Sequence, residues 1–163
     1  MQKKALSELL EIIVDGSLDH DDIQAMLNEV IAAADDAAAY LANDPQSAYR
    51  PELNLPLWQW VLLEQLEDGL LFRADEIPAL YAQIIDAFGD DELELPLAGL
   101  DGLSEQAALY KVQDELEPTF TLVNFSQPFG ARWQTVLVRS QKLSRFLDLA
   151  KALEIPARPS DLA

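Results

Sequence analysis

The 163-residue sequence contains no cysteine and only one histidine, His20. Without cysteine, the chain cannot form disulfides or hold zinc through thiolates. With a single histidine, the chain cannot build a metal site from several histidines, and a Ser-His-Asp triad would have to use His20. The sequence also lacks a phosphate-binding glycine loop, a G-x-S-x-G motif and an H-E-x-x-H motif. These absences do not exclude an enzyme, but they remove the common enzyme classes. We predict a protein that is not an enzyme and uses no cofactor.

Long hydrophobic runs are missing as well. No apolar stretch approaches the roughly 20 residues that a helix needs to cross a bilayer. The N-terminal stretch begins with lysines and is interrupted by Ser7, Glu8 and Glu11. This pattern predicts an amphipathic helix and not a signal peptide. We therefore expect a cytoplasmic, bacterial protein with no membrane partner.

Basic residues are scarce, since 11 Lys and Arg stand against 29 Asp and Glu, which gives a net charge of −18. Residues 1–116 contain 25 acidic and 5 basic side chains, whereas residues 117–163 contain 4 and 6. Such a field repels nucleic-acid phosphates and attracts basic partners. Acidic surfaces also keep proteins dispersed. The charge therefore predicts no nucleic-acid partner, and leaves both a basic protein partner and simple solubility open.

The clearest strand pattern lies in the C-terminal third. Side chains alternate in Thr119–Phe125 and again in Trp133–Val138, as expected when successive residues point to opposite faces of a sheet. The first strand carries apolar groups on both faces, so we expect cover on both sides. Pro128 and Gly130 favour a turn between the strands, which predicts an antiparallel hairpin.

A helix is predicted directly after this hairpin. Ser140 is a suitable N-cap, and Pro156 and Pro159 mark the end of regular structure. The apolar residues fall on one helical face: Leu143, Phe146, Leu147, Ala150 and Leu153.

Residues 1–116 show mainly helical periodicity. The expected helices cover 3–14, 19–42, 57–69, 75–88 and 104–116, with Asp19, Asp75 and Ser104 as N-caps. Leu70 to Arg73 suits a third strand, and the alternation of Leu93, Leu95 and Leu97 suits a short edge strand. The sequence thus predicts one α+β domain over residues 1–163. It comprises five to six helices packed on a small antiparallel sheet, with a C-terminal β-hairpin followed by a helix.

A resemblance to known proteins accompanies the stretch LLEQLEDGLLFRADEIPALYAQIIDAF together with the later hairpin and helix. In element order and charge, most of the chain resembles small acidic bacterial families of unknown function. It also resembles the acidic α/β immunity proteins that neutralise toxins in bacterial competition. The resemblance implies a protein that masks a basic partner, and it transfers no functional residue.

An acidic run begins in the last turn of the predicted helix 75–88 and is the first candidate binding site. Its members are Asp86, Asp90, Asp91, Glu92 and Glu94. Fixed negative charge of this kind speeds the encounter with a basic partner. A pair of carboxylates can also act as general acid and base in a hydrolase. The third interpretation is a solvated loop.

Two aromatic residues complete the candidate site. Trp60 falls off the main apolar stripe of its helix, and Phe129 lies in the predicted turn. Exposed aromatic residues surrounded by charge are typical binding hot spots. By contrast, we expect Trp58 and Trp133 to pack together between helix and sheet.

No metal site is predicted. The stretch Asp15–Asp22 is rich in aspartate, but an EF-hand loop needs Gly at its sixth position and Glu at its twelfth. Those positions hold His20 and Met26. Arg132, Arg139, Lys142 and Arg145 form a basic group, which we expect to pair with carboxylates of the acidic part.

These patterns favour a non-enzymatic binding protein that masks a basic protein partner, as an immunity protein or inhibitor does. The alternatives are a carboxylate-dependent hydrolase and a structural or adaptor subunit. A hydrolase needs a cleft holding two acids of perturbed pKa, and an adaptor needs an exposed apolar patch, for which Trp60 and Phe129 are the candidates. The sequence does not determine the oligomeric state.

Overall fold

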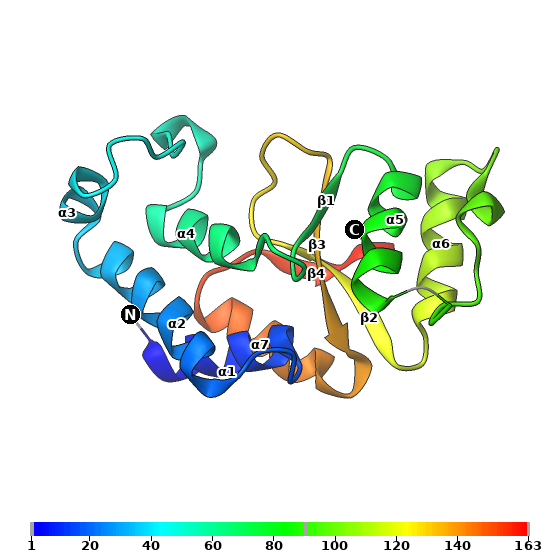
Figure 1. The fold of residues 1–163 in the computed structure, drawn as a ribbon, viewed down its shortest axis with the longest axis horizontal. Helices are drawn as coiled ribbons and strands as arrows, with labels where there is room; N and C mark the ends of the chain where they lie inside the picture. Colours follow the sequence, from blue (N-terminus) through cyan, green and yellow to red (C-terminus); the bar gives the residue numbers. More distant parts are fainter. Residues whose placement is uncertain (1, 90, 163) are drawn as a thin grey trace.

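A computed structural model describes residues 2–89 and 91–162 and shows an α+β fold (Figure 1). Over these residues the chain forms seven α-helices and a four-stranded antiparallel sheet of order β1-β3-β2-β4. The helices are α1 (Lys3–Val14), α2 (His20–Asp35), α3 (Ala37–Ala42), α4 (Leu57–Leu66), α5 (Ile77–Phe88), α6 (Glu105–Leu116) and α7 (Leu143–Ala152). The strands are β1 (Phe72–Ala74), β2 (Phe120–Phe125), β3 (Trp133–Arg139) and β4 (Ala157–Pro159).

The predicted hairpin and the helix after it are confirmed. Strands β2 and β3 pair antiparallel, with Leu122 opposite Leu137 and Val123 opposite Val136. The third strand predicted near residues 70–73 is β1, which pairs with β3. Helix α7 follows the hairpin as expected.

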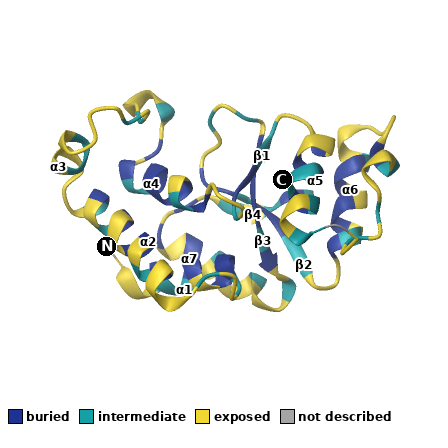
Figure 2. Cartoon of the chain, in the orientation of Figure 1, coloured by how far each residue is buried: buried dark blue, intermediate teal, exposed yellow. Residues whose placement is uncertain are grey.

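The sheet is buried on both faces, as the apolar alternation predicted (Figure 2). Val123 and Val136 belong to a first core, which α1, α2, α4 and α7 complete. Leu122 and Trp133 belong to a second core on the opposite face, which α5 and α6 complete. Figure 1 shows the sheet standing between these two groups of helices. The strands at the centre of the molecule therefore contribute side chains to both cores.

Helix α2 ends earlier than the periodicity predicted, which is why the structure has seven helices. Asp36 adopts φ −150° and ψ 87°, and its side chain accepts a hydrogen bond from the Ala39 backbone N–H. An aspartate that bonds nearby backbone in this way offers an alternative to the helical hydrogen bonds. The alanine-rich segment after it therefore forms a separate helix, α3.

Strand β4 was not predicted, because Pro156 and Pro159 were interpreted as the end of regular structure. β4 pairs with β2 and lies at the edge of the sheet. Proline is tolerated there because an edge strand needs hydrogen-bond donors on one side only. The edge strand expected at Leu93, Leu95 and Leu97 does not form, since a 3₁₀ helix begins at Leu97 after Pro96.

Two of the predicted N-caps are confirmed in the hydrogen bonds and two are not. Asp19 accepts from the Asp22 N–H, and Ser104 accepts from the Ala107 N–H. The Asp75 carboxylate instead accepts from the Arg132 N–H. Ser140 begins a 3₁₀ turn, and its hydroxyl is 2.9 Å from the Thr121 hydroxyl. The Asp75 and Ser140 side chains thus take part in tertiary contacts, which the local sequence does not reveal.

Among the helices formed by residues 2–89 and 91–162, none combines the length and the apolar character that a membrane crossing requires.

Candidate functional site

The predicted aromatic pair is in contact, but it belongs largely to the interior. The ring centroids of Trp60 and Phe129 are 4.8 Å apart, and Trp60 is only 8% exposed. The Arg73 guanidinium lies 4.3 Å from the centroid of the half-buried Phe129 ring, and it donates to the Phe129 carbonyl. These residues therefore hold the β2–β3 loop against the first core. They do not form the exposed aromatic patch that an adaptor would use.

The predicted acidic residues lie elsewhere. Asp86 is in the last turn of α5, and Asp91, Glu92 and Glu94 are exposed in the segment after it. Asp90 lies outside the described residues. The neighbouring leucines of this segment pack against the second core, whereas the aromatic pair packs against the first. The two halves of the predicted site thus lie on opposite sides of the sheet.

The expectation that Trp58 and Trp133 pack together is wrong. Trp58 packs against the first core from α4, and Trp133 projects from β3 into the second core. The central sheet therefore separates the two side chains.

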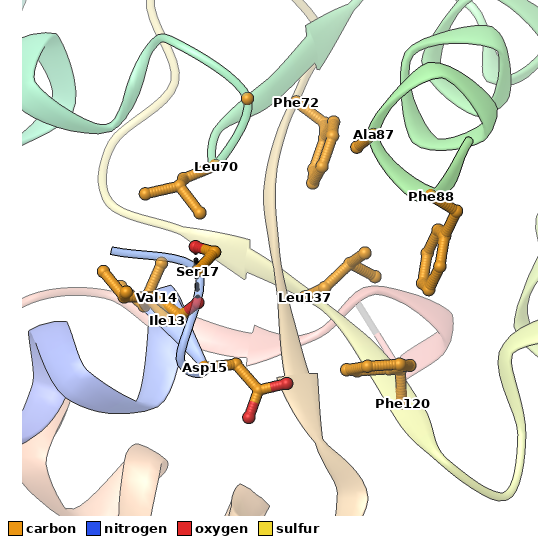
Figure 3. Close-up of a pocket in the computed structure, with 11 residues that line it drawn as sticks. Ile13, Val14, Asp15, Ser17, Leu70, Phe72, Ala87, Phe88, Phe120 and Leu137 are labelled. Carbon is orange, nitrogen blue, oxygen red and sulfur yellow. Dashed lines mark hydrogen bonds between the residues drawn. The ribbon is translucent and has the colours of Figure 1, made fainter. Parts of the chain in front are cut away.

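A pocket lined mainly by apolar residues opens where the two cores meet, and we take it as a candidate binding site (Figure 3). Its volume is about 190 Å³. One wall is aromatic, with the Phe88 and Phe120 rings 5.4 Å apart in an edge-to-face arrangement. The other lining residues come from the α1–α2 turn, the α4–β1 turn and the sheet. They are Ile13, Val14, Asp15, Ser17, Gly69, Leu70, Phe72, Ala87 and Leu137.

The shortness of β1 explains why the pocket exists. β1 pairs with β3 only at Trp133–Thr135, so from Val136 to Arg139 the strand β3 is paired on its β2 side alone. The chain reaches β1 through a tight turn in which Gly69 has φ +89°, a conformation that favours glycine. Leu71 still bonds back to the Leu66 carbonyl at the end of α4. The seam between the cores is therefore not covered by a longer β1.

A second hollow of about 630 Å³ continues from this pocket between α2, α4 and α5. Ser17, Gly69, Leu70 and Ala87 line both spaces. The two spaces thus form one continuous depression, which we call the groove. Its charged lining residues are three aspartates, Asp15, Asp22 and Asp68, and none of the described residues that line it is Lys or Arg. The groove therefore combines an apolar floor with acidic edges.

One ion pair borders the pocket. The Arg139 Nε donates to both carboxylate oxygens of Asp15, at 2.8 and 2.9 Å, and its guanidinium lies 5.1 Å from the centroid of the Phe120 ring. The hydrogen bond to Asp15 raises the pKa of Arg139. Both side chains are partly exposed, so this pair contributes little stability. Its effect is to hold one acidic edge of the groove in position.

The other arginines of the hairpin unit also pair with the acidic part, as predicted. Arg132 lies 2.6 Å from Glu105, and Arg145 binds Glu8. These hydrogen bonds lower the pKa of both carboxyls. Within the described ranges, the three arginines form the ion pairs of the molecule with Glu8, Asp15 and Glu105. The prediction is thus confirmed for Arg132, Arg139 and Arg145, whereas no ion pair of Lys142 is found among the described residues.

The hydrolase alternative calls for two acids of perturbed pKa in one cleft. Glu64 on α4 has a raised pKa because it is partly buried and lies near Asp44 and Glu67, but it does not line the groove. Asp15, which does line it, is held by Arg139. Across residues 2–89 and 91–162, no three His, Asp or Glu side chains are grouped so that they could hold a metal ion.

No protein-family model, curated protein or solved structure matches this chain. The resemblance to immunity proteins therefore stays a prediction.

Proposed function

We propose that this protein is a non-enzymatic binding protein that docks against a basic protein and masks its surface. The observation that carries the proposal is the surplus of unneutralised carboxylates. The chain has a net charge of −18, and within the described residues only Glu8, Asp15 and Glu105 form ion pairs. Arg132, Arg139 and Arg145 are thus already paired, and they neutralise only three carboxylates of the acidic part.

The negative charge of these carboxylates acts on a partner before the two surfaces touch. At physiological ionic strength the screening length is about 8 Å, so neighbouring surface carboxylates still reinforce one another. The combined field attracts a basic protein and raises its association rate. The same field opposes binding to nucleic acid or to anionic membranes. This behaviour is what an immunity protein or inhibitor of a basic toxin would need.

The alternatives have less support. A carboxylate-dependent hydrolase needs a cleft holding two acids of perturbed pKa, whereas Glu64, whose pKa is raised, does not line the groove. An adaptor that uses Trp60 needs that ring at the surface, and it is only 8% exposed. We therefore retain the binding protein as the function that the geometry supports best.

The test is affinity capture from a lysate of the source cell, at about 50 mM and about 500 mM NaCl, followed by titration of the purified captured protein. We expect a basic protein that is retained at low salt and released at high salt. A protein of similar size with near-zero net charge serves as the control bait. Failure to retain any basic protein at low salt, or retention that salt does not weaken, would contradict the proposal.

A further inference from the structure

We propose that the groove receives a basic segment of the partner protein, with an aromatic or large aliphatic side chain in the pocket and lysines or arginines on either side of it. This inference rests on the proposed function. It adds the surface that is used and the chemistry that is recognised.

The pocket suits one large apolar side chain. Its volume of about 190 Å³ exceeds the roughly 150 Å³ of an apolar cavity that accommodates benzene in another protein. Phe88 and Phe120 present aromatic surface to it, and Leu70 and Leu137 present aliphatic surface (Figure 3). Aromatic rings prefer offset or edge-to-face neighbours, which the Phe88–Phe120 arrangement can extend to a third ring.

The pocket is also formed before any partner arrives. Phe72 is 4% exposed and Val14 is 2% exposed, because both belong to the hydrophobic cores. The Ser17 hydroxyl donates to the Val14 carbonyl at 2.7 Å and closes the α1–α2 turn that lines one side of the pocket (Figure 3). A pre-formed pocket loses little conformational freedom when it is filled, which favours binding.

The charges at the groove select what surrounds that side chain. Asp22 and Asp68 are exposed along the wider part of the groove, whereas Asp15 at the pocket is already paired with Arg139. The attraction for a basic segment therefore rests on Asp22 and Asp68. A segment with basic residues beside its apolar anchor would satisfy both features, whereas an acidic segment with the same anchor would be repelled. Charge complementarity thus points to a basic occupant and not to a neutral apolar one.

Synthetic peptides provide a defined probe of this site. We would titrate the full chain with acetyl-Lys-Lys-Phe-Lys-Lys-amide and follow backbone amide signals by NMR. The matched peptides carry Ser in place of Phe, or Glu in place of every Lys. We expect the basic phenylalanine peptide to bind at least about tenfold more tightly than either matched peptide, since a filled apolar pocket and opposite charges both contribute. The largest signal changes should fall on Val14, Ser17, Gly69, Leu70 and Ala87.

Variants of the protein locate the site independently. Ala87 is exposed and lines both parts of the groove, so Ala87→Phe should fill it and weaken the peptide at least about tenfold. Ala79→Phe is the control, because Ala79 is exposed on the same helix but does not line the groove. The double change Asp22→Asn with Asp68→Asn should weaken binding about three- to tenfold, in line with two exposed charge contacts. Its control, Asp35→Asn with Glu52→Gln, removes the same charge elsewhere.

The possible outcomes separate the two proposals. If a basic protein is captured but Ala87→Phe captures it as well as the unchanged chain does, the protein docks through another face and the groove inference is overturned. If the peptides bind equally whatever their charge, basic selection is refuted. If no basic protein is captured at low salt, the proposed function itself fails. Loss of both peptide and partner with Ala87→Phe, but not with Ala79→Phe, supports the groove.

Discussion

The two hydrophobic cores share β2 and β3, and this sharing predicts that they unfold together. Leu122 and Phe125 are both fully buried, but Leu122 faces the second core and Phe125 faces the first. Removal of either side chain deletes apolar contacts and leaves a cavity. Leu→Ala in a core costs about 2–5 kcal/mol and Phe→Ala about 3–5 kcal/mol. We expect each change to lower the stability of the whole chain by about 3 kcal/mol.

Urea unfolding followed by tryptophan fluorescence provides the measurement. Trp58 and Trp60 report on the first core, and Trp133 reports on the second. Each reporter is isolated by changing the other tryptophans to Phe. With a urea dependence of about 2 kcal/mol/M, a loss of about 3 kcal/mol shifts the midpoint by about 1.5 M. Both reporters should shift together after either substitution, because neither core can open without disturbing the shared strands.

Separate transitions would refute this reasoning. If Leu122→Ala shifted only the Trp133 transition, the second core would unfold independently and residues 1–163 would not form one cooperative domain. Leu162→Ala is the matched control, because Leu162 is 74% exposed. It should change stability by less than about 0.5 kcal/mol.

Two further predictions concern titratable groups. Burial, reinforced by Asp44 and Glu67, raises the pKa of Glu64. The ionised side chain therefore destabilises the folded state at a pH above this raised pKa, and the destabilisation disappears at a pH below the ordinary pKa of glutamate. Glu64→Gln should therefore raise the melting temperature at pH 7 but not at pH 4, and a gain that is equal at both pH values would contradict this cause. Burial and the hydrogen bond to Glu29 raise the pKa of Tyr40 to about 12, so its stabilising effect should be lost only as pH rises from about 10 to about 12. Phenolate absorbance, with Tyr40→Phe to identify the signal, checks this value, and a midpoint near 10 would contradict both burial and the hydrogen bond as causes.

Much of the fold follows from local patterns. Alternation in residues 119–125 and 133–138 predicted which side chains of β2 and β3 share a face, and the two cores confirm it. Pro128 and Gly130 marked the turn between these strands. The caps at Asp19 and Ser104 were also predictable, because each side chain bonds a backbone N–H only three residues away.

The candidate site was far less predictable. Charge and aromatic content pointed to the acidic residues after α5 and to Trp60 with Phe129, which the structure places on opposite sides of the sheet. The groove was missed because its lining comes from segments that are distant in the sequence. One signal was present: between Gly69 and Asp75 the chain has room for only a short strand. That strand leaves part of β3 without a second neighbour.

The sequence by itself determined the charge surplus, the absence of cysteine chemistry, the helical periodicities and the two-faced strands, since each depends on composition or on residues within one or two turns. Tertiary structure alone decided that β4 pairs with β2, that Asp75 binds Arg132 instead of capping a helix, and that a groove opens between the cores. These features depend on which distant segments come together. That choice is made by the packing of both cores against one sheet, and no local pattern records it.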